Sequence, residues 1–338
     1  MSTAILSPAA ASPKEDARAA SIPFTEIARD AGQFASEPLV VPKLLSPADV
    51  QAFVQNGFHV APGMVSPEEL EAIKTDTVTL ARGGYECKGL DSLPADYTDQ
   101  QVLEGILCIH QPHFVSPVMR KFVQHPQICG ALSQITAAHL PFWDGSVKCM
   151  QSMLFVKPPT FQGQAWHQDE IYIPTRDRSL IGAWIAVDDA TIENGCLWVV
   201  PGSHQPGYLY PQRPHNNPDE FDFAGESWGF DESQEVPVEV KAGTVVFFNG
   251  YLLHRSRKNR SNIFRRVLVN HYMNTFSPLP WSLKEGESVA NADRRNVIPV
   301  SGIDPYAWKG YDTAPNGVYL RRCQAADEIK ARRQQGQN

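Results

Sequence analysis

Residues Val147-Lys-Cys-Met-Gln-Ser-Met-Leu-Phe-Val156 begin the part of the chain that decides the fold. This run contains no Gly or Pro and has the character of a β-strand. Further runs of the same kind follow at modest spacing, separated by Gly, Pro, Asn and Asp. They are Leu180–Val187, Cys196–Val200, Val236–Val240, Thr244–Phe248 and Val267–Tyr272. Many short strands with turn signals between them are typical of a β-sandwich or barrel.

A long polar segment, Gln205–Glu235, interrupts this series of strands. A segment of this length within a compact domain is usually either functional or disordered. Its aromatic residues favour an ordered lid. They are Tyr208, Tyr210, Phe221, Phe223, Trp228 and Phe230.

The chain before residue 145 carries helix signals instead. Ser46-Pro47 combines an N-cap serine with Pro at the first helical position, and Ser66-Pro67-Glu68-Glu69 adds a capping box. Ser116-Pro117 opens a third helix in the same way. We therefore expect a helical outer layer at residues 45–140 and a β-rich barrel at residues 145–275.

The two ends of the chain have weaker patterns. Residues 1–44 are expected to form a flexible leader. The leader carries Lys14, Glu15 and Asp16 where a secretory signal would have an apolar region, so it is not a signal peptide. Residues 291–338 are expected to form a C-terminal extension.

The composition excludes several classes of protein. With 42% apolar and 20% charged residues, the chain is neither disordered nor fibrous. Its longest apolar run, Leu180–Val187, is far shorter than the 18 or more residues of a membrane span. The net charge of −7 makes nucleic-acid binding a poor hypothesis. Six cysteines without a C-x-x-C pair indicate reduced thiols and a cytoplasmic location.

The stretch His167-Gln168-Asp169 is the first candidate for chemistry. Residues i and i+2 of a strand share a face, so His167 and Asp169 could offer a nitrogen and an oxygen to one metal ion. A further histidine would complete the two-His-one-carboxylate set that binds Fe(II) and leaves positions open. Taken alone the spacing is weak, because a surface histidine beside an acid gives the same pattern.

Four histidines follow this pair and could supply the third ligand: His204, His215, His254 and His271. His204 lies at a Pro-Gly-Ser turn, where local hydrogen bonds are the usual role, and His215 lies in the polar segment. His254 follows the strand Thr244–Phe248. His271 lies within an apolar strand, where a packed side chain is expected.

An anionic co-substrate would need a cationic anchor in the same cavity. Arginine matches a carboxylate with two parallel hydrogen bonds, which lysine cannot do. Arg265 and Arg266 enter the strand that follows His254. Both faces of Val267–Tyr272 are partly apolar, so alternation does not show which arginine enters the barrel.

These residues belong to an ordered series of motifs from about residue 46 to 275. The series is QSMLFVKPP at 151–159, WHQDE at 166–170, AWIA at 183–186, ENGCL at 193–197, VPGSH at 200–204, GTVVFF at 243–248, HRS at 254–256 and the Arg265-Arg266 pair. In order and spacing it resembles the phytanoyl-CoA dioxygenase family of Fe(II)/2-oxoglutarate-dependent oxygenases.

The resemblance implies a mainly β fold with flanking helices, a double-stranded β-helix of the jelly-roll or cupin-like kind. It implies that His167, Asp169 and His254 are the catalytic iron ligands. Arg265, eleven residues after His254, matches the arginine that binds the distal carboxylate of 2-oxoglutarate. Ser256 matches a serine that assists at the same carboxylate.

Other positions follow from the same resemblance. Trp184 matches a tryptophan that lines the co-substrate site, while Met153 and Gln151 lie on the co-substrate strand. Some relatives use a lysine on an earlier segment, and a loose alignment places His110 there. Asp169 argues against a halogenase, in which a small residue makes room for chloride.

The implied function is a dioxygenase that uses Fe(II), 2-oxoglutarate and O₂, hydroxylates a small-molecule substrate, and forms succinate and CO₂. Desaturation, cyclisation or epimerisation at the same iron site is the alternative within enzymes. A non-catalytic, cupin-like metal or ligand-binding module is the alternative from another class. The motif series favours a single oxygenase domain at residues 45–290, with 205–235 as its lid. The substrate and the oligomeric state stay open.

Overall fold

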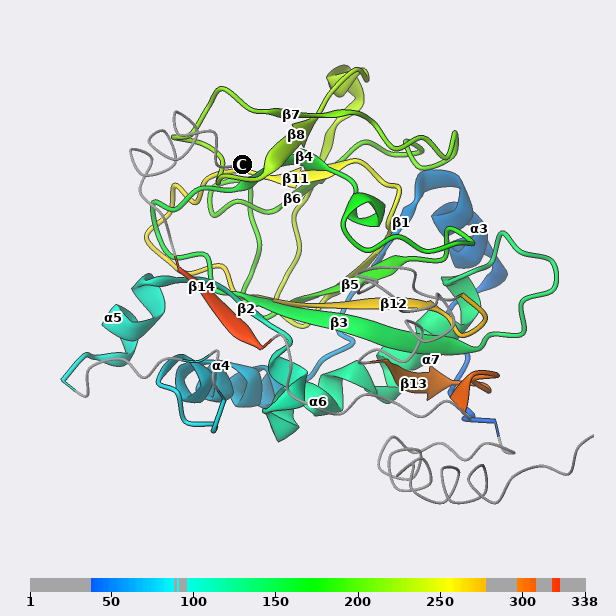
Figure 1. Cartoon of the computed structure of the whole chain (residues 1–338), viewed down its shortest axis with the longest axis horizontal. Helices are drawn as coiled ribbons and strands as arrows, with labels where there is room; N and C mark the ends of the chain where they lie inside the picture. Colours follow the sequence, from blue (N-terminus) through cyan, green and yellow to red (C-terminus); the bar gives the residue numbers. More distant parts are fainter. Residues whose placement is uncertain (1–37, 88–89, 91–95, 278–296, 308–317, 323–338) are drawn as a thin grey trace, which may run out of the picture.

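Two facing β-sheets form the centre of the molecule. A computed structural model describes residues 38–87, 90, 96–277, 297–307 and 318–322. A large sheet and a small sheet face each other, and helices lie on the far side of the large sheet (Figure 1). The strand pairs in both sheets are antiparallel. This is the two-layer arrangement that the resemblance led us to expect.

The large sheet contains eight described strands. Seven of them form a continuous path in the order β1 (Phe58–Ala61), β10 (Val245–Asn249), β5 (Ile181–Ala186), β12 (Val267–Asn274), β3 (Val147–Phe155), β2 (Ile106–His110) and β14 (Tyr319–Arg322). The eighth, β13 (Ile298–Ser301), pairs with β3 outside this path. Segments far apart in the sequence therefore complete one sheet.

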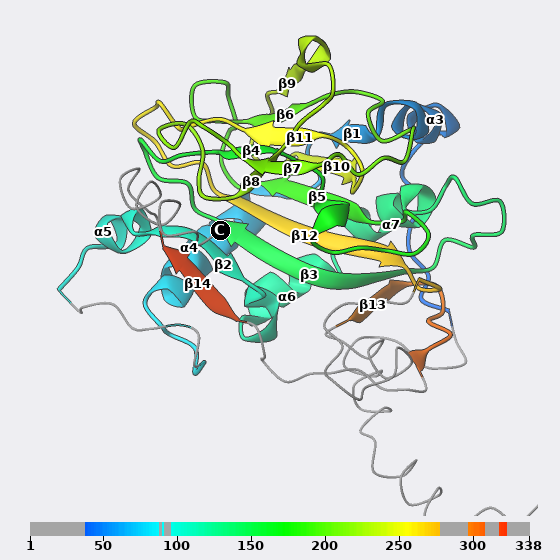
Figure 2. The ribbon, with the colours of Figure 1, turned by 45° about the horizontal axis from the view of Figure 1, so that its top comes forward.

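The small sheet has four strands in the order β4 (Gln164–His167), β11 (His254–Ser256), β6 (Leu197–Val199) and β9 (Val236–Val238). A separate two-stranded ribbon joins β7 (Gln212–Pro214) to β8 (Gly225–Ser227). This ribbon belongs to the segment predicted as a lid, and it lies close to β4 and β11 (Figures 1 and 2). The lid segment is therefore built around a strand pair.

Three helices cover the outer face of the large sheet. They are α4 (Pro67–Ala81), α6 (Pro117–Val123) and α7 (Pro126–Ile135) (Figures 1 and 2). Helix α3 (Pro47–Asn56) packs beside β1, and the short α5 (Asp99–Glu104) precedes β2. The predicted helical character of the first part of the chain is thus present, although β1 and β2 interrupt it.

Local capping explains where the first two helices begin. The Ser46 hydroxyl accepts a hydrogen bond from the backbone N–H of Asp49, whose carboxylate accepts one from the backbone N–H of Ser46. Ser66 and Glu69 make the same reciprocal pair at α4. Each such cap is worth about 1 kcal/mol, and the predicted starts of these two helices are confirmed.

The central strands of the large sheet are buried on both faces. On β5, Ala183 and Ile185 pack in the core shared with the helices, whereas Trp184 and Ala186 pack between the two sheets. Strands covered on both faces have nearly continuous apolar sequences, without the alternation of a half-exposed strand. This explains why alternation could not orient Arg265 and Arg266.

A β-bulge on β3 changes which side chains face the space between the sheets. His271 of β12 pairs with Gln151, and the next residue, Tyr272, pairs with Cys149, so Met150 has no partner across the ladder. An extra residue in one strand turns the side chains on one side of it to the opposite face. Gln151 and the residues two and four further on therefore face the other sheet.

The predicted domain limits stay a prediction, with two observations that bear on them. Strands β13 and β14 come from the predicted extension 291–338, yet both pair with the large sheet. Most of the predicted leader 1–44 lies outside the described residues, but Leu39 forms a bridge with Gly302. None of the described helices combines the length and the apolar character that crossing a membrane requires.

Candidate functional site

Two histidines and one aspartate meet at the edge of the small sheet. His167 is the last residue of β4, and His254 is the first residue of β11. The two residues are direct partners in the antiparallel pairing of these strands. Asp169 follows at the start of the short 3₁₀ helix η2 (Asp169–Ile171). The structure thus brings together the three residues that were predicted as iron ligands.

Asp169 lies just beyond the strand on which it was expected. Gln168, between it and His167, has φ −127° and ψ 126°, which is extended backbone. The alternation of side chains therefore continues for one residue past the strand end. Asp169 shares the inward direction of His167, so the argument from spacing holds despite the shorter strand.

Hydrogen bonds orient both imidazole rings. Nδ1 of His167 lies 2.8 Å from the carbonyl oxygen of Ala165, and Nδ1 of His254 lies 2.9 Å from that of Leu252. A carbonyl oxygen can only accept, so Nδ1 carries the hydrogen in each ring and Nε2 is left with its lone pair. Both Nε2 atoms lie 3.6 Å from Oδ1 of Asp169.

The donor set fits a divalent metal ion. The three ligand atoms all lie within 4.8 Å of one another. Burial is the main cause that lowers the pKa of His167, to about 4, and the neighbouring His254 ring adds to it. The His167 imidazole is therefore neutral at pH 7, as a metal ligand must be. Burial acts to raise the pKa of Asp169, but the surrounding histidines outweigh it and keep this carboxylate ionised.

His271 is a member of this site that the sequence did not reveal. Its Nε2 donates to Oδ2 of Asp169 at 2.9 Å, and the side chain is only 4% exposed. Oδ1 of Asp169 is the oxygen that faces His167 and His254. The expectation of a merely packed histidine was incomplete. The sequence signal for this role was a single histidine in an apolar strand, but that signal did not indicate Asp169 as its hydrogen-bond partner.

The ligand cluster opens onto a cavity of about 740 Å³ between the two sheets. Arg265 lies at its buried end, only 4% exposed, with its guanidinium 5.6 Å from the centre of the Trp184 ring. Burial lowers the pKa of Arg265 to about 10, so it stays protonated at neutral pH. Its Nε has no hydrogen-bond partner among the described residues. A carboxylate bound there would supply one.

Ser256 and Lys157 complete this buried end. Nζ of Lys157 donates to the Ser256 hydroxyl at 3.2 Å, and the backbone N–H of Gln164 donates to the same oxygen at 3.2 Å. Burial, and after it the charge of Arg265, lowers the pKa of Lys157 well below its usual range. Lys157 was not among the predicted site residues, although a single lysine at the end of an apolar run was a signal of a buried polar site.

The neighbouring Arg266 points away from the cavity. Its Nε and Nη2 each bond to one oxygen of Asp188 at 2.8 Å. Arg265 and Arg266 therefore divide between the inside and the outside of the barrel, as expected. Arg265 is the one that lines the cavity.

The remaining predicted co-substrate residues also lie on the cavity wall. Gln151 and Met153 line it from β3, next to the bulge, and His110 lines it from β2. The His110 ring stacks on Tyr319 of β14, with the ring centres 4.2 Å apart. Trp184 lies at the Arg265 end, as described above. The structure thus collects all nine predicted site residues, His110 included, around one cavity.

The lid segment forms part of the same wall. Residues of β7, of β8 and of the loop between them line the cavity, and they include Arg213, Asp222 and Phe223. Gly163, just before β4, exchanges two backbone hydrogen bonds of 2.8 Å with residues 220 and 222. A Cβ at Gly163 would lie 1.8 Å from the carbonyl oxygen of Ser256, so only glycine fits this approach. The lid is therefore docked next to the predicted co-substrate serine.

Comparison with known families identifies the chain. A sequence model of the family described as Phytanoyl-CoA dioxygenase (PhyH) matches residues 53–267. The chain belongs to the phytanoyl-CoA dioxygenase family. The match includes the three candidate metal ligands and Arg265. It ends before His271 and before β13 and β14, so the phytanoyl-CoA dioxygenase family match itself does not describe those parts of the site.

Curated relatives in the phytanoyl-CoA dioxygenase family match between about half and 70% of the chain. Phytanoyl-CoA dioxygenase domain-containing protein 1 of Danio rerio is 27% identical over 291 residues, which covers 70% of this chain and 94% of the relative. Phytanoyl-CoA dioxygenase 1 of Oryza sativa subsp. japonica is 33% identical over 167 residues, covering 49% of this chain and 56% of the relative.

Solved structures with a similar fold confirm the double-stranded β-helix. The non-heme monooxygenase ThoJ aligns with a TM-score of 0.56 at 19% identity, over 85% of this chain and 96% of that chain. The epimerase SnoN, solved with Fe³⁺, alpha ketoglutarate and nogalamycin RO, aligns with a TM-score of 0.52 at 18% identity, over 69% and 84%. The jelly-roll prediction is therefore confirmed.

Proposed function

We propose that this protein is a non-haem Fe(II)/2-oxoglutarate-dependent dioxygenase that hydroxylates a small molecule. Family membership supports the general class, an iron- and 2-oxoglutarate-dependent oxygenase. One observation carries the proposal for this chain. His167, Asp169 and His254 converge with their ligand atoms inside a buried cavity, the donor set that Fe(II) oxygenases use.

The other end of the cavity suits the co-substrate. Arg265 would bind the distal carboxylate of 2-oxoglutarate, and the Ser256 hydroxyl would donate to the same group. Trp184 packs beside the guanidinium and limits where that carboxylate can lie. Gln151 and Met153 would contact the body of the co-substrate from β3. The 2-oxo acid end would then reach toward His167 and Asp169.

The side chains around the cavity would mainly position the metal and the reactants. When bound, iron together with 2-oxoglutarate and O₂ supplies the oxidation of a C–H bond, with release of succinate and CO₂. His271 holds Oδ2 of Asp169, so that Oδ1 is presented to the metal. The lid and β14 line the cavity beside the candidate metal ligands. These groups bind and orient the reactants, and none of them needs to transfer a proton.

Hydroxylation is the reaction we propose. The fold is compatible with other outcomes, because its solved relatives include the epimerase SnoN and the carbocyclase SnoK. We propose the cytoplasm as the location, although rat phytanoyl-CoA dioxygenase carries the word peroxisomal in its name. Direct detection of a hydroxylated product would separate hydroxylation from epimerisation and ring closure.

Loss of the metal ligands tests the centre of the proposal. We expect His167→Ala and His254→Ala each to abolish Fe(II) binding and succinate formation. Metal content after reconstitution and succinate release from 2-oxoglutarate are the measurements. Full succinate production by either variant would show that the ligand assignment is wrong. A wild-type protein that binds Fe(II) but never forms succinate would instead favour a non-catalytic, cupin-like module.

The two adjacent arginines provide a matched pair for the co-substrate. We expect Arg265→Ala to raise the 2-oxoglutarate concentration needed for half-maximal turnover by at least about tenfold, because a charge-assisted pair is worth roughly 1.5–3 kcal/mol. Arg266→Ala, which removes only the outer contact with Asp188, should leave that concentration unchanged. If Arg266→Ala produced the larger effect, the anchor would be Arg266.

A further inference from the structure

The wall of the cavity differs in composition from the chain as a whole. The chain has a formal net charge of −7. Among the described residues, the cavity wall nevertheless carries more basic than acidic side chains. The basic ones are Lys157, Arg213, Arg255, Arg265 and Arg321, and the acidic ones are Asp169 and Asp222. Whether one of these side chains can bind a second anion depends on the partners that it already has.

Two of the basic side chains are already committed elsewhere. Arg213 pairs with Glu226 at 3.1 Å and lies over the Trp228 ring. Arg255 bonds to Glu235 and lies 4.4 Å from the centre of the Trp166 ring. Both are therefore held by the lid and by the outer side of the small sheet.

Arg265 and Lys157 belong to the buried end, where the proposed co-substrate binds. Arg321 is the basic residue that this assignment leaves over. It lies on β14, on the opposite wall from the small sheet, and it lines the cavity. The second anion is therefore expected at Arg321.

Arg321 is held in place but not fully used. Its Nη2 donates to Oδ2 of Asp222 at 2.9 Å, and the guanidinium lies 4.9 Å from the centre of the Phe223 ring. Oδ1 of Asp222 accepts from the backbone N–H of Ala224 at 3.0 Å. Nε of Arg321 has no hydrogen-bond partner among the described residues. Nε of Arg265 is in the same situation at the proposed co-substrate site. A buried donor without an acceptor is costly, which favours an acceptor from a ligand.

Two residues connect Arg321 with the candidate metal ligands. Burial, and after it the charges of Arg321 and His271, lowers the pKa of His110 to about 4. Burial also raises the pKa of Tyr172 to about 12, with added contributions from Asp169 and Asp222. The centre of the Tyr172 ring lies 6.2 Å from that of the His167 ring, and the His110 ring stacks on Tyr319, two residues before Arg321 on β14. A molecule bound to Arg321 would therefore reach the metal past His110 and Tyr172.

Aromatic side chains lie along this route. Tyr172, Phe223 and Tyr319 line the cavity, yet they are 48%, 40% and 45% exposed. Large aromatic surfaces left open on a cavity wall are typical of ligand sites, where an apolar body covers them. The route from Arg321 to the metal site therefore exposes aromatic surface, and the unpartnered Nε of Arg321 lies at its outer end.

We propose that the substrate is an organic carboxylate with an apolar or aromatic body. Its carboxylate binds Arg321 at the outer end of the cavity, and its body lies along Tyr172 and Phe223 toward the metal. The carbon to be oxidised is thus remote from the carboxylate. This inference rests on the proposed function and specifies the substrate class of the same site.

Matched pairs of acids and amides test this assignment. The probes are octanoate, decanoate, phenylacetate and 3-phenylpropionate, each with its primary amide. Their dissociation constants are measured anaerobically with the full chain, Fe(II) and 2-oxoglutarate. We expect at least one acid to bind about tenfold more tightly than its amide, the loss expected when a charge-assisted hydrogen bond is removed. If no acid in the panel binds, or if acids and amides bind equally, the proposal is wrong.

Three variants separate recognition from a structural role. Arg321→Gln should abolish the preference for the acid, whereas Arg322→Gln, at the exposed neighbouring position on β14, should keep it. Asp222→Asn should keep or strengthen acid binding, because it removes the negative charge beside Arg321. An ion pair that only holds the lid predicts the opposite, namely that Asp222→Asn and Arg321→Gln weaken binding together. That result would overturn the proposal.

The visible absorption of the anaerobic Fe(II)–2-oxoglutarate complex distinguishes a failure of the proposed function from a failure of the substrate assignment. If the wild-type protein does not form this complex, the proposed function fails. If the complex forms in the wild type and in all three variants while the acid preference is missing, only the substrate assignment fails.

Discussion

At the scale of single residues, each candidate metal ligand has a partner that fixes its direction. Backbone carbonyl groups hold the Nδ1 atoms of His167 and His254, and His271 holds the outer oxygen of Asp169. Outer partners of this kind commonly change metal affinity by about 10–100-fold when they are removed. His271 is the only side chain among these partners, so it is the one that substitution can test.

We predict that His271→Leu weakens metal binding by about 10-fold or more, because Asp169 loses the bond that directs Oδ1 inward. His271→Gln, which can still donate a hydrogen bond, should recover part of the affinity. Equilibrium titration with Fe(II) or Co(II) measures the effect.

His204→Leu provides the control for this experiment. Nε2 of His204 donates to the carbonyl oxygen of Val54 in α3, so its loss should leave metal affinity unchanged. Unaltered affinity in His271→Leu would mean that the bond to Asp169 has no positioning role.

The sequence predicted the members of the site better than their exact roles. The family resemblance identified His167, Asp169 and His254, whereas local strand geometry accounts only for the shared direction of His167 and Asp169. Alternation could not choose between Arg265 and Arg266, since both faces of that sheet are buried, and only the family resemblance pointed to Arg265. The bulge at Met150 and the bond from His271 to Asp169 depend on contacts between distant strands, which no local pattern contains.

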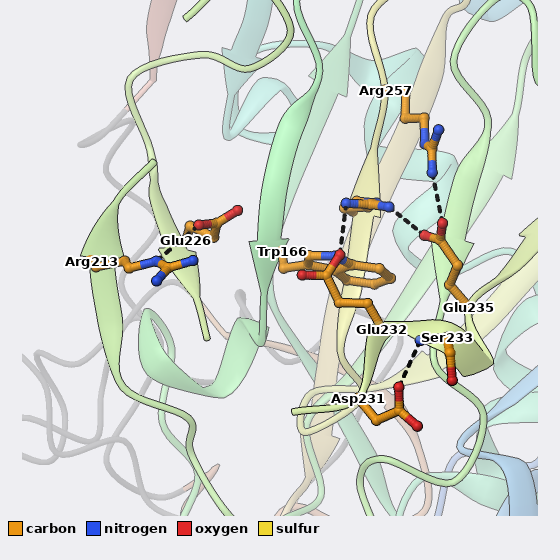
Figure 3. Close-up of polar contacts among 9 residues, drawn as sticks. Trp166, Arg213, Glu226, Asp231, Glu232, Ser233, Glu235 and Arg257 are labelled. Atoms are coloured by element: carbon orange, nitrogen blue, oxygen red, sulfur yellow. Dashed lines mark hydrogen bonds and ion pairs between the residues drawn. The ribbon is translucent and has the colours of Figure 1, made fainter. Parts of the chain in front are cut away.

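At the scale of elements, the end of the lid is fastened to the small sheet by a cluster of charged and aromatic side chains (Figure 3). Glu235 bonds to Arg255 at 2.5 Å and to Arg257 at 2.7 Å. The Trp166 indole N–H donates to Glu232 at 2.9 Å. This cluster lies on the outer face of β4 and β11, directly behind the two histidines of the candidate metal site.

We predict that Glu235→Ala destabilises the protein by about 1–3 kcal/mol, because the mostly buried Arg255 and the partly exposed Arg257 lose the carboxylate that they share. The lid segment 205–235 should also become more susceptible to limited proteolysis. Urea unfolding and protease digestion followed by mass spectrometry measure the two effects.

Asp231→Ala is the matched control for the Glu235 variant. Asp231 lies in the same part of the lid, but it is exposed and only caps the neighbouring Ser233. A much smaller change is expected. Equal effects of the two variants would show that the Arg255–Glu235–Arg257 arrangement contributes no specific stability.

At the scale of the whole molecule, buried neutral histidines make the fold sensitive to acid. Burial, and after it the charge of Arg120, lowers the pKa of His113 to about 3, and its side chain lies in the core near β3. The unfolded chain would bind a proton at His113 below its ordinary pKa of about 6.5. The folded chain does not bind that proton until about pH 3. Stability is therefore complete above pH 6.5 and is lost as the pH falls from there toward 3.

We predict that His113 alone accounts for a loss of about 2 kcal/mol in the free energy of unfolding between pH 7.5 and pH 5. His113→Asn should be less stable at pH 7.5 but should lose correspondingly less on acidification. Denaturant titrations at both pH values, with a chelator present to exclude metal, provide the comparison.

The exposed His139 supplies the control, and His139→Asn should retain the pH dependence of the wild type. An unchanged pH dependence in His113→Asn would contradict the assignment of the acid sensitivity to His113.

The pairing of β1 with β10 has a consequence for the order in which the chain can fold. Phe58 lies opposite Phe248, so β1 cannot pair until β10 has been synthesised. In the same way, β3 pairs with β12, whose residues are more than a hundred positions later in the chain. During synthesis the capped helices can form early from local contacts, while their apolar faces have no sheet to cover. Closure of long loops slows folding and prolongs that exposure. A ribosome-bound chain that stops before residue 249 should therefore depend on chaperones, and release of the last strands should trigger assembly of the large sheet.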